Sequence, residues 1–259
     1  MQPWHSLEGK HVWVTGGAGH LGAPIVRALD AAGARVLCID LPGKAEALVR
    51  QHGLTRTQAA AFDLVDVDGL PAFLAQCAQG HGAPDGCVHL ATASSAGKRL
   101  EQLPPADFAH TFGAGLTPTF VLSRAVAELM KPRGTGSVVL FASMYGVVAP
   151  DPRIYAAPLT PNPIDYGAAK AAVLQLARYL AVHYGPAGIR FNCVTPGPFP
   201  HPVVQQEQPG FITELAPKTA LGRIGAPGDI VGPTLFLLTD SAAFVTGHSL
   251  AVDGGWTAW

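Results

Sequence analysis

Two side chains with acid–base potential lie four residues apart in the segment 165–181, DYGAAKAAVLQLARYLA, whose pattern is that of a helix. Tyr166 and Lys170 are therefore neighbours on one helix face. A free phenol has a pKa of about 10 and holds its proton too tightly to act as a base at neutral pH. A nearby ammonium stabilises the phenolate, and lowering its pKa by about 2–3 units requires about 3–4 kcal/mol. Such a pair can move a proton to or from a substrate oxygen, although a surface Tyr–Lys pair without function has the same spacing.

A hydroxyl suited to this pair occurs upstream, at Ser143. It follows the apolar run SVVLFA (137–142), which is typical of a buried strand, and it precedes Tyr166 by 23 positions. A serine at a strand end can hydrogen-bond the reacting oxygen of a substrate. The three side chains together indicate proton transfer at an alcohol or carbonyl oxygen while hydride moves at the adjacent carbon.

A glycine-rich turn, TGGAGHLG (15–22), follows the apolar run HVWV. A strand, such a turn and then a helix are the context in which glycines indicate nucleotide binding. Gly16 permits the tight turn, Gly19 lets the backbone approach a phosphate, and Gly22 allows the helix to pack closely on the strand. The diphosphate then meets the free N–H groups of the helix start. His20 stands where many such turns have a further glycine, and we interpret it as a working variant.

Two acidic residues end the next strands along the chain. Asp40 lies 18 residues after Gly22, where a carboxylate accepts from the adenosine ribose hydroxyls and repels a 2′-phosphate. No basic residue adjoins it until Lys44, so the sequence favours NAD(H) over NADP(H). Asp63 ends the third strand and can approach the adenine amino group, and a role in capping a turn explains it equally well.

The elements that position these residues alternate along the chain, with short apolar runs separated by amphipathic helices. This order predicts an α/β fold, doubly wound and Rossmann-like, with a parallel sheet of seven strands flanked by helices. Two Pro-rich stretches, 149–163 and 196–210, each follow a strand and are expected at the carboxyl edge of the sheet, where ligands bind. The expected strands are 11–15, 35–39, 59–62, 86–91, 137–142, 190–194 and 249–253, and the helices 20–33, 44–52, 67–80, 106–130, 165–184 and 227–239.

Composition excludes several classes of function. The 259 residues carry a net charge of −1 and only 14% charged side chains, without a block of like charges, so we expect no nucleic-acid partner. No apolar run approaches the roughly 18 residues of a membrane span, and the first residues lack the pattern of a secretory signal. The four cysteines show no metal-ligand spacing, so we expect reduced thiols, no metal site and a cytoplasmic location.

Taken in order, these motifs cover nearly the whole chain and resemble the short-chain dehydrogenase/reductase family. The stretches RFNCVTPG (190–197) and VDGGW (252–256) are also similar to motifs of that family. The resemblance implies one Rossmann-like domain over residues 1–259, with substrate loops at about 144–164 and 198–222. It implies a nicotinamide cofactor, Ser143, Tyr166 and Lys170 as the catalytic set, a small-molecule substrate, and a homodimer or homotetramer.

The resemblance also extends the expected cofactor site beyond the motifs. Its full expected lining is Gly16, Gly19, His20, Leu21, Gly22, Asp40, Leu41, Asp63, Leu64, Ala91, Tyr166, Lys170, Pro196, Gly197 and Phe199.

A narrower resemblance concerns the substrate. The stretches YGVVAPDPRIY, IDYGAAKAAV and VDGGWTAW are similar to a bacterial subgroup linked to flagellar glycan and nonulosonic acid sugars. It implies a sugar, sugar acid or nucleotide sugar as substrate, and with the preference that Asp40 indicates we expect an NAD(H)-dependent oxidoreductase acting on it. Two alternatives remain: a 3-oxoacyl or small-ketone reductase, which would prefer NADPH, and a dinucleotide-binding regulatory protein without turnover.

The chain departs from the family pattern at three places. His89 stands where the family has an asparagine, and a hydrogen-bonded core histidine is the interpretation we favour. Gly115 replaces a helix asparagine that supports a water relay to the lysine, and Pro118 can free backbone carbonyls that hold this water instead. His201 replaces a threonine near the nicotinamide, within what we interpret as a variable substrate lid. We also considered that a protonated His20 helps to hold the diphosphate.

Overall fold

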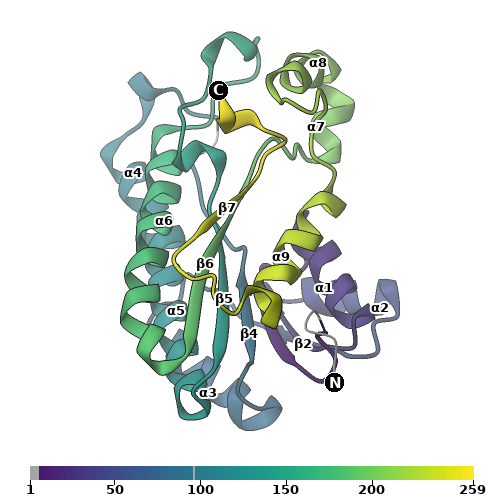
Figure 1. The fold of residues 1–259 in the computed structure, drawn as a ribbon. Coiled ribbons are helices and arrows are strands. Elements are labelled where there is room, and N and C mark those ends of the chain that lie inside the picture. The colour runs from purple at the N-terminus through teal and green to yellow at the C-terminus, as the bar shows by residue number, and fades with distance from the viewer. Residues whose placement is uncertain (1–5, 96) are drawn as a thin grey trace.

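The computed structural model describes residues 6–95 and 97–259, in which seven parallel strands form one sheet (Figure 1). The strand order is β3-β2-β1-β4-β5-β6-β7, and all pairs are parallel. The doubly wound α/β architecture expected from the sequence is therefore confirmed. The strands are β1 (His11–Thr15), β2 (Arg35–Asp40), β3 (Thr57–Ala61), β4 (Gly86–His89), β5 (Gly136–Phe141), β6 (Ile189–Pro196) and β7 (Ser249–Val252).

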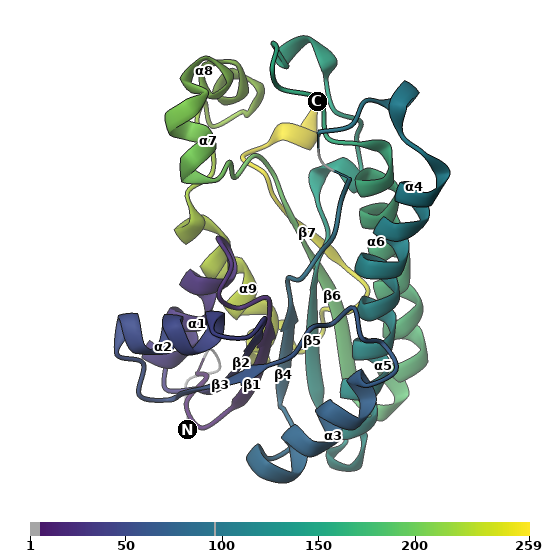
Figure 2. The same cartoon turned by 180° about the vertical axis from the view of Figure 1, so that it is seen from behind.

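Helices cover both faces of the sheet. In Figures 1 and 2, α1, α2 and α9 lie on one side and the long helices α5 and α6 on the other, while α7 and α8 stand beyond one end of the sheet. The α-helices are α1 (Gly22–Ala31), α2 (Lys44–His52), α3 (Leu70–His81), α4 (Pro105–Thr111), α5 (Thr117–Met130), α6 (Ile164–Tyr184), α7 (Pro202–Glu207), α8 (Pro209–Leu215) and α9 (Val231–Leu238).

Alternate residues of the central strands supply two separate cores. Trp13 of β1 packs with the α3, α5 and α6 side, whereas its neighbours Val12 and Val14 pack with α1, α2 and α9. The same alternation occurs in β5, where Leu140 belongs to the first core and Val139 to the second. Since both faces are buried, the strands are continuously apolar, which is why the sequence reveals them clearly.

The site is positioned by the reversal of strand order. Growth of the sheet changes direction at β1, which pairs with β2 on one side and with β4 on the other. In open α/β sheets the crevice beyond the carboxyl ends of the strands at this point is the usual ligand site. The glycine-rich turn follows β1 directly, and Ser143 comes two residues after the end of β5.

Local structure differs from the expected pattern in two regions. The expected helix 106–130 is interrupted by a π-helical turn, η2 (Phe112–Leu116), so that α4 and α5 are separate. The Pro-rich stretch after β6 forms α7 and α8, each beginning with a proline at its first position, where the missing N–H costs nothing. Among the described residues, no helix is both long and apolar enough to cross a membrane.

Candidate active site

The glycine-rich turn has no room for side chains at Gly16 and Gly22, where a Cβ would meet backbone atoms. Gly16 has a φ of +70°, and a Cβ there would lie 2.9 Å from the backbone nitrogen of Ala91. A Cβ on Gly22 would lie 2.3 Å from the carbonyl oxygen of Gly16. In the first turn of α1, which begins at Gly22, the Ala23 N–H is bonded to the Gly19 carbonyl and Pro24 has no N–H. Among the described contacts, the N–H groups of His20, Leu21 and Gly22 are therefore those left for a ligand. This cradle fits the diphosphate of a dinucleotide.

Asp40 has a structural role in the same turn. Its carboxylate accepts hydrogen bonds from the backbone N–H groups of Ala18, at 2.9 Å, and of Leu41, at 2.8 Å. Each carboxylate oxygen keeps a further lone pair for a ribose hydroxyl. Asp63, in contrast, accepts from the N–H of Val65 at 3.1 Å, which is the turn-capping arrangement considered from the sequence.

A cavity of about 260 Å³ lies between the glycine-rich turn and the ends of β5 and β6. It brings together most of the residues expected from the sequence: Gly16, Gly19, His20, Leu21, Gly22, Ser143, Tyr166, Lys170, Pro196, Gly197 and Phe199. Four further residues line it that sequence reasoning missed: Leu90, Thr92, Phe141 and Ala142. The expected residues outside its lining are Asp40, Leu41, Asp63, Leu64 and Ala91. The four missed residues follow or end β4 and β5, and strand-end position was the only signal for them.

The Ser143, Tyr166 and Lys170 side chains meet in this cavity. The Lys170 ammonium donates to the carbonyl oxygen of Phe141 at 2.7 Å and lies 5.8 Å from the centre of the Tyr166 ring. Burial lowers the pKa of Lys170 to about 8. Burial also raises the pKa of Tyr166, although a hydrogen bond from Ser143 opposes this. The expected lowering of the phenol pKa is therefore not produced by the protein side chains alone.

A second cavity, of about 190 Å³, adjoins the first and shares four of its residues, which are Ser143, Tyr166, Gly197 and Phe199. Its other polar lining comes from Tyr145, which follows Ser143 closely, and from Tyr155 and Asn162 in the Pro-rich stretch 149–163. The phenolic oxygens of Tyr145 and Tyr155 are 2.8 Å apart. We refer to this space as the catalytic cavity, because it offers hydrogen-bonding groups beside the Tyr166 hydroxyl.

The N-terminus of α6 is fixed by a buried carboxylate. Asp165 is fully buried and accepts hydrogen bonds from the backbone and hydroxyl of Ser95, at 3.2 and 2.8 Å, and from the Thr111 hydroxyl. Burial alone would raise the pKa of Asp165, but these hydrogen bonds lower it overall. The residue immediately before Tyr166 thus joins α6 to α4 and to the segment after β4. Sequence reasoning missed it, although an acidic residue in the first helical turn is a recognisable signal.

His89 belongs to a chain of buried hydrogen bonds. Its Nδ1 lies 2.6 Å from the Thr15 hydroxyl and its Nε2 lies 2.8 Å from the Thr119 hydroxyl, which itself donates to the Gly115 carbonyl at 2.7 Å. Because the single Thr119 proton is used in this way, His89 must donate from Nε2 and accept at Nδ1. Burial, with a smaller contribution from Lys170, lowers the pKa of His89 to about 3, so the ring is neutral.

This chain confirms the interpretation of His89 as a hydrogen-bonded core histidine. It also bears on the water relay, which stays a prediction. Pro118 cannot donate to the carbonyl of Ala114, four residues back, and the neighbouring Gly115 carbonyl in η2 accepts from the Thr119 hydroxyl. One lone pair of this oxygen remains available.

His20 lies against His201 of the segment after β6. The two ring centroids are 5.1 Å apart, and the Nε2 of His20 is buried without a hydrogen-bond partner among the described residues. Burial and the neighbouring His201 lower the pKa of His20. The surroundings therefore oppose a protonated His20, contrary to the hypothesis that its charge holds a diphosphate.

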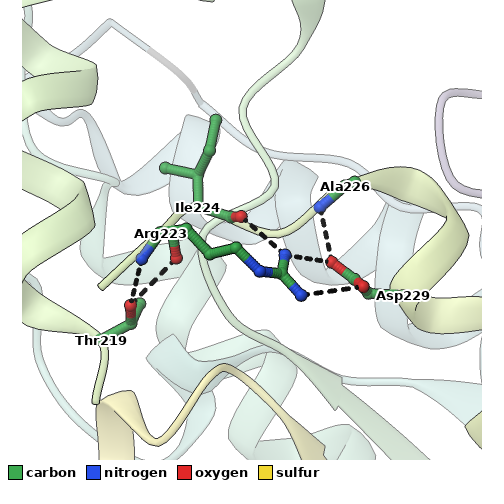
Figure 3. Close-up of polar contacts among 5 residues, drawn as sticks. All are labelled: Thr219, Arg223, Ile224, Ala226 and Asp229. Carbon is green, nitrogen blue, oxygen red and sulfur yellow. Dashed lines mark hydrogen bonds and ion pairs between the residues drawn. The ribbon is translucent and has the colours of Figure 1, made fainter. Parts of the chain in front are cut away.

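The segment after β6 is anchored at its far end. The Arg223 guanidinium donates to both oxygens of Asp229 and to the Ile224 carbonyl, while the Arg223 backbone exchanges hydrogen bonds with the Thr219 hydroxyl (Figure 3). Asp229 also accepts from the Ala226 N–H at 2.8 Å (Figure 3). These contacts fix the turn between this segment and η8 (Pro227–Ile230), just before α9.

An ion pair joins the two segments that border the catalytic cavity. The Lys218 ammonium lies 2.5 Å from a carboxylate oxygen of Asp151, whose side chain is 17% exposed. Asp151 also accepts from Arg153, and these hydrogen bonds hold the pKa of its carboxyl well below the usual range.

Across residues 6–95 and 97–259, no group of three or more His, Cys, Asp or Glu side chains could hold a metal ion.

Comparison with known proteins gives the site a context. A family model described as Enoyl-(Acyl carrier protein) reductase matches residues 17–257. The chain is 34% identical to 2,5-dichloro-2,5-cyclohexadiene-1,4-diol dehydrogenase of Sphingobium indicum, with 97% of this chain and 98% of the relative aligned. It is 32% identical to galactitol 2-dehydrogenase (L-tagatose-forming) of Cereibacter sphaeroides, with 98% and 97% aligned.

Solved structures resemble the fold throughout. A short-chain dehydrogenase from Leptospira borgpetersenii with bound NAD+ has a TM-score of 0.86 and 30% identity, covering 99% of this chain and 96% of that one. A gluconate 5-dehydrogenase from Burkholderia cenocepacia in complex with NADP and tartrate has a TM-score of 0.87 and 26% identity, covering 98% of both chains.

Proposed function

Because the chain belongs to the short-chain dehydrogenase/reductase family, and is thus an NAD(P)-dependent oxidoreductase of secondary alcohols and carbonyls, we propose that it acts on a sugar or sugar-derived substrate with NAD(H). The observation that carries this proposal is the convergence of Ser143, Tyr166 and Lys170 on the cavity behind the glycine-rich turn. That cavity continues into a second one lined by hydroxyl and amide groups.

The three side chains divide the proton chemistry among them. Tyr166 takes the proton of the substrate hydroxyl during oxidation and returns it during reduction. Ser143 hydrogen-bonds the same substrate oxygen and holds it toward the phenol. Lys170 supplies positive charge close to Tyr166, and when bound, the nicotinamide accepts or supplies the hydride. Since burial raises the pKa of Tyr166, the lowered pKa required for catalysis depends on Lys170 together with the positive ring of the oxidised cofactor.

Asp40 supports a preference for NAD(H). Its carboxylate ends β2 beside the glycine-rich turn, where it can accept from ribose hydroxyls and would repel a 2′-phosphate. Lys44 is exposed at the start of α2 and makes no ion pair with Asp40 among the described residues. The relatives with NAD+ and with NADP bound show that both cofactors occur in similar folds, so the carboxylate is the feature on which we base the preference.

The substrate class rests on three observations. The cavity beside Tyr166 is lined by Tyr145, Tyr155 and Asn162, which suit a ligand rich in hydroxyl groups. One relative is named for galactitol, and a similar structure contains tartrate. The resemblance to the flagellar glycan and nonulosonic acid subgroup favours a sugar, sugar acid or nucleotide sugar.

We extend the proposal to the domain organisation, the oligomeric state and the location of the protein. The chain forms one domain over residues 1–259, in which the segments at about 144–164 and 198–222 enclose the substrate. It assembles as a homodimer or homotetramer, and the exposed apolar side chains Phe120 and Val182 on α5 and α6 support this. Its four cysteines are all free and buried, which suits the reducing cytoplasm.

A 3-oxoacyl or small-ketone reductase is the second candidate. The description of the matching family model names an acyl carrier protein, although for an enoyl and not an oxo group, and so shares only the carrier with this candidate. It would prefer NADPH, which Asp40 opposes. Turnover of acetoacetyl thioesters with NADPH would support this candidate.

A panel of sugars, alditols, sugar acids and nucleotide sugars with NAD+, NADP+ and their reduced forms tests the proposal. Absorbance of the reduced nicotinamide at each pairing reports turnover. We expect alditol or sugar oxidation with NAD+ at a kcat/KM at least about tenfold above that with NADP+. Turnover of acyl thioesters alone, or of sugars with NADP+ alone, would contradict it.

A further inference from the structure

A larger cavity lies next to the catalytic cavity. Its volume is about 420 Å³, and Tyr155 and Asn162 line both spaces, so these two side chains stand at the boundary between them. The catalytic cavity alone, at about 190 Å³, is below the range of roughly 300–1,000 Å³ usual for small-molecule sites. We call this larger space the outer cavity.

A hydrogen-bonded pair of phenols lies at the boundary between the two cavities. The phenolic oxygens of Tyr145 and Tyr155 are 2.8 Å apart, and either hydroxyl can be the donor. If Tyr145 donates, the Tyr155 hydroxyl keeps its own proton for a ligand, and if Tyr155 donates, its oxygen keeps a lone pair for one. In both arrangements Tyr155 has a hydrogen-bonding position left for a ligand in the outer cavity.

The Tyr155 ring is held in place from the other side. It lies against Phe211 of α8, with ring centroids 5.1 Å apart. The hydroxyl at its tip is therefore a preorganised hydrogen-bonding group, held by Tyr145 and Phe211 and lining a space that a substrate can enter.

The charges around the outer cavity are balanced. Lys98 is paired with Asp107, and the remaining charged lining residues, Arg99 and Glu101, have opposite signs. Prolines and aliphatic side chains form most of the other walls and offer apolar surface for C–H groups. A neutral ligand with alternating hydroxyl and C–H groups fits this lining better than a strong anion does.

We infer that the outer cavity is a substrate subsite that binds the far end of a neutral polyhydroxylated chain, with the Tyr155 hydroxyl forming a hydrogen bond to a hydroxyl several carbons from the reacting one. This inference rests on the proposed alcohol oxidation at Tyr166. It makes Tyr155 a specificity-determining residue rather than a participant in proton transfer.

The experiment compares galactitol, which has six carbons, with 2,3-butanediol, which has no hydroxyl beyond the reacting pair. In Tyr155→Phe we expect the KM for galactitol to rise about tenfold, because one oriented hydrogen bond is lost, with kcat within about twofold of the unaltered protein. The KM for 2,3-butanediol should stay within about twofold. If the diol is not turned over, its inhibition constant against galactitol is measured instead.

A second variant tests the space rather than the hydrogen bond. Leu159 lines the outer cavity and not the catalytic cavity. Leu159→Trp should therefore raise the KM for galactitol and leave the KM or inhibition constant of 2,3-butanediol unchanged. Tyr179→Phe, at a Tyr on α6 that is 67% exposed, is the matched control and should change neither.

Three outcomes would overturn the subsite. Equal changes for both ligands in Tyr155→Phe would assign the residue to general structure, and a lower KM for D-galactonate than for galactitol would contradict a neutral ligand. Turnover of 2,3-butanediol without any turnover of galactitol would reject the subsite while leaving the proposed oxidation intact. Failure of the unaltered protein to oxidise any alcohol would reject both.

Discussion

The substitution His89→Asn tests whether this ring is the neutral centre of a buried hydrogen-bond chain. In the folded protein His89 accepts from Thr15 and donates to Thr119, and its pKa is lowered to about 3. In the unfolded chain a histidine has a pKa of about 6.5. Between these values the unfolded chain binds a proton that the folded protein does not, so stability must fall as the pH falls through this window.

The size of the effect follows from the two pKa values. The pKa of His89 is about 6.5 in the unfolded chain and about 3 in the folded protein. Proton binding to the unfolded chain therefore lowers the free energy of unfolding by about 0.2 kcal/mol at pH 7 and by about 2 kcal/mol at pH 5. His89 therefore accounts for about 2 kcal/mol of stability lost between these two pH values. Asparagine does not titrate, so the variant should lose that much less over the same interval. At pH 7 the variant itself should be less stable by about 1–3 kcal/mol, because buried Thr15 and Thr119 lose hydrogen-bond partners.

Urea unfolding followed by far-ultraviolet circular dichroism at pH 7 and pH 5 measures both quantities. His183→Asn is the matched control, since His183 is exposed on α6 and should leave the pH dependence unchanged. A loss between pH 7 and pH 5 that is equal in His89→Asn and in the unaltered protein would refute the assignment of a buried neutral ring.

Three further predictions concern cofactor and substrate binding. Asp40→Ala should weaken NADH binding about tenfold and narrow the difference in affinity between NADH and NADPH, measured by fluorescence titration; an unchanged NADH-to-NADPH affinity ratio would contradict the role of the carboxylate. Gly16→Ala should abolish measurable NADH binding, because a Cβ would clash with Ala91 and the φ of +70° is strained, and wild-type affinity would contradict the described turn. Lys218→Ala should raise the substrate KM about threefold, and less in high salt, by releasing Asp151; a salt-independent effect would count against the ion pair.

The sequence was most informative where burial and backbone geometry constrain it. The expected strands 11–15 and 86–91 correspond to β1 and β4 because both faces are covered and apolar side chains run without interruption. The Tyr166–Lys170 spacing and Gly16 at positive φ are local features that one helix and one turn determine. The third strand was placed two residues late, since β3 begins with the polar pair Thr57 and Gln58 near the sheet edge.

Contacts between residues far apart in the chain could not be predicted from local sequence patterns. Nothing in the local sequence pairs Asp165 with Ser95 or His89 with Thr119, since these residues are brought together only by packing of α4, α5 and α6. The bond between Tyr145 and Tyr155 likewise depends on the path of the Pro-rich segment after β5. Helices α7 and α8 were missed because their prolines stand at first helical positions, which a pattern dominated by Pro and Gly conceals.

Steady-state oxidation by Tyr166→Phe, measured with NAD+ and the substrate that the panel identifies, is the most direct test of the proposed chemistry. The change removes one hydroxyl and keeps the ring among its neighbours. We expect kcat to fall by at least about 100-fold while the dissociation constant for NADH stays within about threefold. Tyr179→Phe should keep full activity. A Tyr166→Phe protein that retains kcat within a few-fold of the unaltered enzyme would contradict the assignment of Tyr166 as the acid–base.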